Sequence, residues 1–593
     1  MQAADKYEKT RSGNEAWRLR RTTGGAKVII LFLSGMLMTA SVPPLDWSAA
    51  AWVALMPLFW ICFGQNWRRA ALSGFFWGLG WAFTGFYWLR EIDPVIPYLM
   101  APVMALFVSA WSCLVPGITR GLLIPNNVQL QGYSAVKKFI PESVLKTFFY
   151  AVVLAAWWCI VEWFRSRLLP WNYVSASQWR NLSLIQICSV TGTYGVSFLI
   201  VLTNITLALA FRNSLMEMKK RTRFPQAYPF FLTLLLVLAV AISGVYRCRE
   251  GKPLSSQVSF NAGLIQGDIS QRRQATIEQA VEALEVYLKM SHDAARLKPA
   301  PDIIIWPETA TPFAYKDGSW LGRSYRNGLG DFIRSAKVPV LLGTVDYETL
   351  PPHSKRIPGM TNSAFLFASD GSHRATYSKI QRVPFGEYVP FRKYLPEWVI
   401  NRIDMHRDLV SGAGFSPLRI LPGIRAGISI CYEDVFEYIS RREALENANL
   451  LLVITNDAWY PTSSEPEQHL ANSVFRAVET GLPMLRCGNN SASCLIEPDG
   501  YISDCLFKKG TVAAPEIRGR RAGIINVKAP FKPKLTFYVR YGNVFLGFCW
   551  FVVLAGLTVS VLNWRRRKQY LLGKWGNTNE HEQTRTDMDG EGK

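Results

Sequence analysis

Long apolar runs dominate the first 246 residues, whereas apolar and polar positions alternate over shorter distances in most of the chain that follows. A helix that crosses the hydrocarbon core of a bilayer needs about 20 predominantly apolar residues. Eight runs approach that length, at roughly 28–43, 49–64, 71–90, 98–124, 147–166, 184–211, 227–246 and 542–563. The first two are short and are separated by Pro43–Pro44, which predicts tilted or partly buried segments. The pattern therefore predicts a membrane α-helical bundle of about eight spans.

Residues 247–540 have the shorter periodicities of a water-exposed domain. Strands are expected at 258–265, 302–306, 338–343, 362–368, 427–430, 450–455, 484–487 and 492–496. Helices are expected near 275–296, 328–335 and 466–480. Strand–helix units that are followed by hairpins favour an α/β sandwich.

These patterns divide the chain into five expected parts. They are a basic leader (1–27), a transmembrane bundle (28–246), an extracytoplasmic domain (247–540), a final transmembrane helix (541–564) and a basic, polar tail (565–593).

The net charge of +22 would suit a nucleic-acid partner, but its distribution argues against one. Many basic residues cluster beside apolar runs: Arg18, Arg20, Arg21 and Lys27; Arg68 and Arg69; Lys137 and Lys138; Lys219, Lys220, Arg221 and Arg223; Arg565, Arg566, Arg567 and Lys568. Lys and Arg that flank membrane spans mark the cytoplasmic side and attract anionic lipids. We therefore expect membrane lipids and no nucleic acid as partners, both termini in the cytoplasm, and residues 247–540 on the opposite side. The loop near 165–180 fits less well, because it carries three arginines on the outer side.

Three apolar stretches each lead to a reactive side chain: Glu308 after 303–307, Lys379 after Tyr377–Ser378, and Cys431 after 427–430. A cysteine thiol attacks an acyl carbonyl once a neighbouring base, here Glu308, takes its proton. The ammonium of Lys379 would favour the thiolate and stabilise the oxyanion of the intermediate. Taken one at a time, each residue has a plainer interpretation as a core thiol or a solvated surface charge.

The order of the motifs changes that interpretation. Four motifs in a fixed order closely resemble the Glu-Lys-Cys set of the nitrilase superfamily. They are W-P-E (306–308), Y-S-K (377–379), V-P-F-G-E-Y-V-P (383–390) and C-Y-E (431–433). With its membrane flanks, the chain resembles the apolipoprotein N-acyltransferase family along nearly its whole length. The resemblance implies a nitrilase-type αββα sandwich for residues 247–540.

The resemblance also implies a role for each matching residue. Glu308 would be the general base, Lys379 the cation that stabilises the oxyanion, and Cys431 the nucleophile. Glu387 would support Lys379, and Tyr432 and Glu433 would shape the pocket.

The family's reaction proceeds in two steps and needs neither a cofactor nor a metal. Cys431 would take an acyl chain from a phospholipid as a thioester. The α-amine of the N-terminal diacylglyceryl-cysteine of an apolipoprotein would then receive it. The resemblance implies a multi-pass protein of the bacterial inner membrane with its catalytic domain on the periplasmic side.

One departure concerns the stretch Gln266–Gln271, which is not followed by the Lys-Trp pair that is usual in the family. The aromatic contact that the family implies there, for a local lid or for lipid, is missing. Two other functions are considered: a membrane-tethered nitrilase-type amidase that uses the same thiol chemistry, and a catalytically silent lipid-binding or assembly protein. Retention of all three catalytic residues argues against the latter.

Some polar residues and cysteines keep two interpretations each. His469 is expected to have a structural role near a helix start rather than to act as a ligand or proton carrier. Glu162 and Arg165, which are neighbours on one helix face, would form a structural pair or contact a lipid head group. Cys487, Cys494 and Cys505 would be able to form a disulfide if the domain lies in an oxidising compartment.

Overall fold

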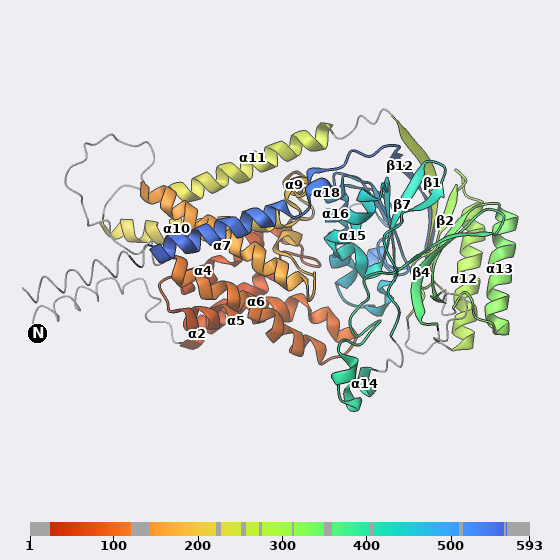
Figure 1. The fold of residues 1–593 in the computed structure, drawn as a ribbon, viewed down its shortest axis with the longest axis horizontal. Helices are drawn as coiled ribbons and strands as arrows, with labels where there is room; N and C mark the ends of the chain where they lie inside the picture. Colours follow the sequence, from red (N-terminus) through yellow and green to blue (C-terminus); the bar gives the residue numbers. More distant parts are fainter. Residues whose placement is uncertain are drawn as a thin grey trace, which may run out of the picture.

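A computed structural model describes residues 24–119, 142–220, 227–250, 256–271, 276–310, 314–348, 358–403, 408–508, 514–562 and 565. The molecule is elongated, with a helical bundle at one end and a two-sheet domain at the other (Figure 1). Most of the predicted basic leader and tail, and the basic pair Lys137–Lys138, lie outside the described residues.

Most of the bundle precedes the two-sheet domain in the chain, and one helix follows it. Its elements are α2 (Gly24–Thr39), α3 (Ala51–Ala54), α4 (Met56–Cys62), α5 (Trp67–Gly85), α6 (Ile96–Thr119), α7 (Glu142–Ser166), α8 (Leu182–Ile185), α9 (Cys188–Thr191), α10 (Tyr194–Lys220), α11 (Tyr228–Glu250) and the helix Val544–Leu562. Within the described residues, five helices are long and apolar enough to cross a membrane: α6, α7, α10, α11 and Val544–Leu562. The helical bundle is thus confirmed, with five candidate membrane helices among the described residues, while the count of about eight spans stays a prediction.

The expected span 184–211 is wrong at its beginning. Two short helices, α8 and α9, occupy its first part, and α10 begins only at Tyr194. Gly192 has a φ of 65°, a left-handed conformation that ends α9 and redirects the chain. An apolar pattern does not register such a break, because the residues on both sides of it are buried.

Helices α2 and α5 pack backbone against backbone. A Cβ atom at Gly35 would clash with the carbonyl oxygen of Trp77, and one at Gly80 would clash with the carbonyl oxygen of Phe32. Small residues permit this close approach between helices in a bilayer, where packing replaces the hydrophobic effect.

Two six-stranded sheets form the centre of the domain. The first has the order β12-β1-β2-β3-β4-β5 and the second the order β11-β10-β9-β8-β7-β6. Strands β1–β3 are parallel, as are β7–β9, and the outer strands are antiparallel. The strands are β1 (Gln257–Gln266), β2 (Ile303–Ile305), β3 (Val340–Tyr347), β4 (Met360–Phe367), β5 (His373–Ser378), β6 (Leu418–Leu421), β7 (Ile424–Ile430), β8 (Leu450–Thr455), β9 (Met484–Gly488), β10 (Cys494–Ile496), β11 (Ile502–Cys505) and β12 (Arg521–Pro530).

Helices cover the outer faces of the two sheets, which gives the expected αββα layers (Figure 1). Helices α12 (Ile277–Ala295) and α13 (Trp320–Ala336) pack on the first sheet, and α15 (Glu437–Leu445) and α16 (Glu465–Thr480) on the second. Apolar side chains of both sheets fill the space between them. The α15–α16 layer faces the bundle, and its buried side chains belong to the same continuous core as those of the membrane helices.

The expected core strands are present, but four outer strands (β5, β6, β11 and β12), helices α14 (Glu397–Ile403) and α15, and the first part of α13 escaped prediction. The side chains of strand β5 are largely exposed. Strand β12 pairs with β1, although nearly the whole domain separates the two strands in the sequence. Helix α13 begins at Trp320 rather than near 328, and Ser319 caps its first turn. The apolar pattern marks buried strands and is weak where one face of an element meets solvent.

The described cysteines are not joined by disulfides. Cys494 in β10 and Cys505 in β11 are register partners on adjacent strands, while Cys487 is buried in β9 with its thiol 3.3 Å from the carbonyl oxygen of Ile305.

Candidate active site

Three strand ends bring the predicted catalytic side chains together. Glu308 follows β2, Lys379 follows β5, and Cys431 follows β7 on the facing sheet. The ammonium of Lys379 lies 3.3 Å from Glu308 Oε1, and the Cys431 thiol is close enough to the same carboxylate to lower the pKa of Glu308. Rigid strand ends hold side chains precisely while leaving their tips open to a pocket.

Glu308 is fixed by the packing of the strand that precedes it. The Trp306 indole N–H donates to Ser291 Oγ at 2.8 Å, and its ring stacks on Tyr287 of α12 with centroids 5.1 Å apart. On the other side, Gly343 of β3 lies directly against the Glu308 backbone, where a Cβ atom would clash. Burial raises the pKa of Glu308 although Lys379 opposes the shift, so its carboxylate is a stronger base than one in water.

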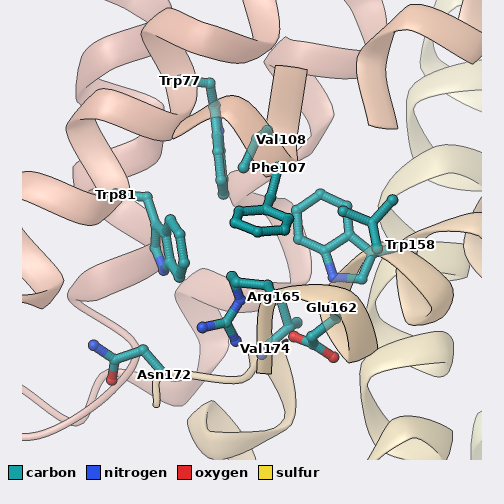
Figure 2. A pocket seen from close by; sticks show the side chains of 10 residues that line it. Trp77, Trp81, Phe107, Val108, Trp158, Glu162, Arg165, Asn172 and Val174 are labelled. Carbon is teal, nitrogen blue, oxygen red and sulfur yellow. Dashed lines mark hydrogen bonds between the residues drawn. The ribbon is translucent and has the colours of Figure 1, made fainter. Parts of the chain in front are cut away.

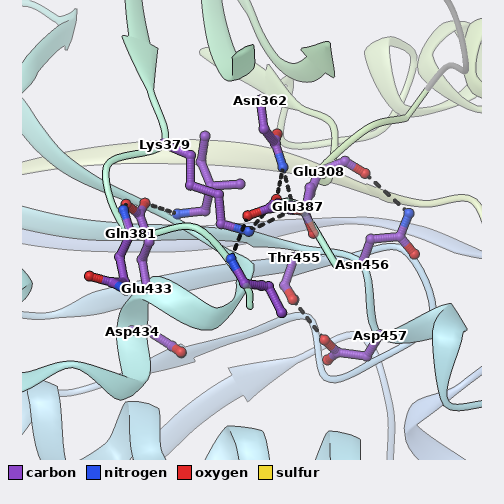
Figure 3. Close-up of polar contacts among 12 residues, drawn as sticks. Glu308, Asn362, Lys379, Gln381, Glu387, Glu433, Asp434, Thr455, Asn456 and Asp457 are labelled. Atoms are coloured by element: carbon purple, nitrogen blue, oxygen red, sulfur yellow. Dashed lines mark hydrogen bonds and ion pairs between the residues drawn. The ribbon is translucent and has the colours of Figure 1, made fainter. Parts of the chain in front are cut away.

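Lys379 lies between two carboxylates (Figure 3). Its ammonium donates to Glu387 Oε1 at 2.9 Å in addition to Glu308. The amide of Asn362 donates to both carboxylates, at 2.7 Å to Glu308 and 3.0 Å to Glu387. Burial alone would lower the pKa of Lys379, but the two carboxylates outweigh it and hold that pKa well above its usual value. The side chain therefore stays cationic.

Cys431 stands at a sharp turn from β7 into the 3₁₀ helix Cys431–Val435. Its φ is 53°, a left-handed conformation that is unfavourable for a residue with a side chain and is often found at functional sites. Burial, with the negative charge of Glu308, raises the pKa of the thiol well above its usual value, and Lys379 only partly offsets this. At neutral pH the resting thiol is protonated and needs a base to become a nucleophile.

Glu433 joins the two catalytic strands. Its Oε1 accepts hydrogen bonds from the backbone N–H of Ile380 at 2.7 Å and of Gln381 at 3.0 Å, next to Lys379. Its Oε2 accepts from the N–H of Ile430 at 2.8 Å, next to Cys431. Burial raises the pKa of Glu433 to about 7 despite these donors. The carboxylate thus fixes the spacing between the lysine and cysteine strands.

Two family models match successive parts of the chain. The first is described as apolipoprotein N-acyltransferase N-terminal domain and matches residues 34–206; the second, carbon-nitrogen hydrolase, matches residues 261–517. A relative from Geobacter metallireducens that is named apolipoprotein N-acyltransferase is 30% identical over 91% of this chain and 95% of its own. The chain belongs to the apolipoprotein N-acyltransferase family.

Relatives of the same name in Allorhizobium ampelinum and Thermotoga maritima are each 27% identical to this chain. The matches cover 82% and 94% of this chain and 89% and 98% of the relatives. Among solved structures, an amidase from Nesterenkonia sp. is 16% identical, covers 49% of this chain and 96% of its own, and has a TM-score of 0.31. Family membership therefore rests on the sequence relatives and not on this structural likeness.

In this member of the apolipoprotein N-acyltransferase family, the bundle contributes to the surroundings of the nucleophile. The Tyr432 ring stacks on Trp171, which comes from the membrane half of the chain, with centroids 6.3 Å apart and planes 20° apart. The ring centroid of Trp171 also lies 5.2 Å from that of Trp88, and the Trp88 centroid lies 5.0 Å from that of Tyr460. The nucleophile thus lies at the face of the domain that meets the bundle.

A buried ionic network lies beside this aromatic group. His469 in α16 contacts Asp434 Oδ1 at 2.6 Å and Asp457 Oδ1 at 3.1 Å, and Arg486 donates to Asp434 Oδ2 at 2.5 Å. Burial opposes a charge on His469, but the two aspartates outweigh it and raise the pKa of the imidazole well above its usual value. Asp457, Glu465 and His469 also bring potential metal ligands within 4.8 Å of one another. His469 and Arg486 supply positive charge to this network, and both ring nitrogens of His469 contact carboxylates.

The structure brings the side chains of Glu308, Lys379 and Glu387 into contact, with Cys431 beside them. Glu433 bonds the strand ends next to Lys379 and Cys431, and Tyr432 faces Trp171. The catalytic roles of these residues stay a prediction. Sequence reasoning missed Asn362, which bridges the two carboxylates. A run of three polar residues, Thr361–Ser363, at the start of a strand that ends in apolar residues was the available signal. It also missed the contact of Trp171 with Tyr432, since no local pattern links positions so far apart in the chain.

Proposed function

We propose that Cys431 takes an acyl chain from a membrane phospholipid as a thioester and passes it to the α-amine of the N-terminal diacylglyceryl-cysteine of an apolipoprotein. The observation that carries the proposal is the set of buried Glu308 and Lys379 with half-buried Cys431, at the face where the domain meets the bundle. Membership of the apolipoprotein N-acyltransferase family supports the same reaction.

In the first step, Glu308 accepts the thiol proton while Cys431 Sγ attacks the ester carbonyl carbon. The positive charge of Lys379 stabilises the oxyanion that forms. The intermediate collapses with cleavage of the carbon–oxygen bond, and Glu308 returns its proton to the leaving lysophospholipid. In the second step, the amine nitrogen attacks the thioester, Glu308 receives a proton from it, and the Cys431 thiolate leaves and is reprotonated.

The remaining predicted residues have supporting roles in the proposal. Glu387 orients the Lys379 ammonium, to which it is bonded at 2.9 Å. Tyr432 forms part of the wall on the bundle side, and Glu433 holds the lysine and cysteine strands together. None of these roles requires a cofactor or a metal.

We further propose that about eight segments of the bundle lie in the bacterial inner membrane, with residues 247–540 on the periplasmic side and both termini in the cytoplasm. The five long helices, the shorter apolar helices Gly24–Thr39 and Ser48–Cys62, and α5 at the place of the expected span 71–90 support this count. The basic clusters of the sequence support the orientation. A bilayer would hold both lipid substrates near the nucleophile and so raise their effective concentration.

Mass spectrometry of the purified protein with a defined phospholipid tests the reaction. We expect an acyl-sized mass gain on Cys431 that a diacylglyceryl-cysteine peptide discharges faster than water does, and no gain in Cys431→Ser. A membrane-tethered amidase would instead release ammonia from simple amides and show no gain with phospholipid. Inactivity in both assays would favour a silent lipid-binding protein.

A further inference from the structure

The carboxyl end of α7 holds the backbone of the loop that follows it, residues 167–181, here named the connecting loop. Arg165 Nη1 donates to the carbonyl oxygens of Leu169 at 3.1 Å and of Trp171 at 2.6 Å. Glu162 Oε1 accepts a hydrogen bond from the N–H of Val174 at 2.8 Å. Both charged side chains are buried, each only 4% exposed, and they face the same cavity (Figure 2).

Aromatic rings surround this arrangement. Trp77, Trp81, Phe107 and Trp158 line the cavity next to the two charged groups (Figure 2). The Arg165 guanidinium lies 5.3 Å from the ring centres of both Trp81 and Tyr173, so cation–π attraction offsets part of its loss of water. A charged side chain near a membrane span is costly to bury, and its retention there points to a function.

The connecting loop presents one side chain to the catalytic domain. Trp171 is 1% exposed, and its indole N–H donates to Gln468 Oε1 of α16 at 2.8 Å. Gln468 in turn donates to the carbonyl oxygen of Pro43, which ties a second bundle loop to the same point at 3.0 Å. The Trp171 ring stacks on Tyr432, the residue directly after the nucleophile.

A second anchor fixes the other side of Trp171. Asn172 has a φ of 50°, and its amide donates to the carbonyl oxygen of Gly85 at the end of α5 at 2.7 Å. The backbone around Trp171 is therefore held by α5 and α7 together. Without Arg165, the carbonyl group of Trp171 would lose its donor, and that of Leu169 would keep only the N–H of Trp171 at 2.9 Å. The loss of a donor in a buried place favours another loop conformation.

We infer that Glu162 and Arg165 are positioning residues for the reaction at Cys431, because they hold the connecting loop and thereby keep Trp171 against Tyr432 beside the nucleophile. This inference rests on the proposed acyl transfer. It assigns the two residues to a link between the bundle and the thiol, rather than to a lipid head group.

Arg165→Gln tests the inference in the full-length protein in detergent micelles. Two reactions of Cys431 are followed by mass spectrometry: acylation by phospholipid and alkylation by iodoacetamide. We expect the rate constant of acylation to fall by on the order of tenfold or more, since small displacements near reacting groups are costly. The fraction of Cys431 that is finally acylated, and the rate of alkylation, should stay close to those of the parent protein. Arg165→Lys, which keeps a donor for both carbonyl groups, should recover part of the rate.

Arg167→Gln is the matched control, because Arg167 is on the same segment but exposed, with its guanidinium over Trp163. It should acylate at the parent rate. An unchanged rate in Arg165→Gln overturns the inference, and so does a lower final acylated fraction at an unchanged rate constant, which marks partial unfolding. If Arg165→Gln does not fold, Trp171→Leu takes its place. For Trp171→Leu we again expect a lower rate constant of acylation, with the final acylated fraction and the rate of alkylation unchanged. Failure of the parent protein to acylate overturns the proposed function itself, a result distinct from these.

Discussion

At the scale of single residues, one ammonium and two carboxylates share a buried space. Lys379 contacts Glu308 and Glu387, and Asn362 donates to both carboxylates. Removing one member of a buried charged group leaves an uncompensated charge, which costs about 3–5 kcal/mol. Each of these residues therefore helps to stabilise the geometry around Cys431.

The pH dependence of acylation follows from Glu308. Burial raises its pKa above the usual 4.5, and only the ionised carboxylate accepts the thiol proton. The rate of Cys431 acylation should therefore fall as pH is lowered into the acidic range, and the fall should begin above the usual carboxyl pKa. Glu308→Gln should be slower by on the order of 10²–10⁴ and lack this dependence. Rapid-quench mass spectrometry measures both rates, and a parent rate that is flat over this range would contradict the assignment of the base.

The raised pKa of Glu433 implies that stability falls as pH rises, whereas the acylation rate is expected to rise with pH. Its folded-state pKa of about 7 is higher than the usual 4.5, so folding binds a proton. The resulting stabilisation is present below pH 4.5 and is lost as pH rises through 7, a change of about 3 kcal/mol. Glu433→Gln loses an acceptor for backbone N–H groups, and we expect a lower Tm at about pH 5 and a smaller difference from the parent protein at about pH 8.

Differential scanning fluorimetry in detergent would measure these melting temperatures. Glu285→Gln, an exposed site on α12, is the control and should leave the pH profile of Tm unchanged. A difference between Glu433→Gln and the parent protein that grows with pH would refute the raised pKa.

At the scale of elements, β2 and β3 control the position of the base. Strand β2 is only three residues long, and Glu308 lies beyond its end against Gly343 of β3. The absence of a side chain at Gly343 lets the Glu308 backbone approach β3 closely. The base is thus placed by a contact between strands as well as by its own rotamer.

Gly343→Ala should displace Glu308 while leaving the rest of the sheet intact. We expect acylation to slow by on the order of a hundredfold, because the added methyl group would overlap the Glu308 backbone. Gly414→Ala is the matched control, since a Cβ atom there meets nothing within 4 Å. The acylation rate of both variants is measured, and circular dichroism checks that both are folded. Equal rates would show that β3 accommodates the methyl group without displacing Glu308.

The elements also show what the sequence could predict. The buried strands β1, β2, β7 and β8 and the strand-end residues Glu308 and Cys431 were predicted, because continuous apolar runs and short motifs are local signals. Strands β5 and β12 were missed, since one is largely exposed and the other is defined by its distant partner β1. The contact between Trp171 and Tyr432 depends on how the bundle packs against α16, which no window of sequence contains.

At the scale of the whole molecule, the domain is bonded to the bundle at several separate points. The N–H of Thr193 donates to Glu479 Oε1 at 2.9 Å, and Gln186 donates to the carbonyl oxygen of Asp499 at 2.8 Å. The buried side chains of α15 and α16 continue the core of the bundle. The domain therefore has a fixed orientation towards the plane in which lipids would lie.

Labelling of introduced cysteines tests the proposed orientation in the membrane. Tyr501 is 46% exposed on the domain, and Arg68 is exposed at the start of α5, on the side expected to be cytoplasmic. In spheroplasts, a membrane-impermeant maleimide should label Tyr501→Cys above the level of the parent protein and should label Arg68→Cys only after lysis. The reverse pattern would place the domain in the cytoplasm.

The pairing of β1 with β12 sets an order of events during synthesis. Gln257 at the start of β1 faces Pro530 at the end of β12, 273 positions later in the chain (530 − 257). Translation at about 5–20 residues per second leaves the edge of β1 without its partner for roughly a quarter of a minute to a minute. An unpaired strand edge invites association with other chains. The nascent domain is therefore most vulnerable to aggregation just before its last strand, and with it the final membrane helix, is made.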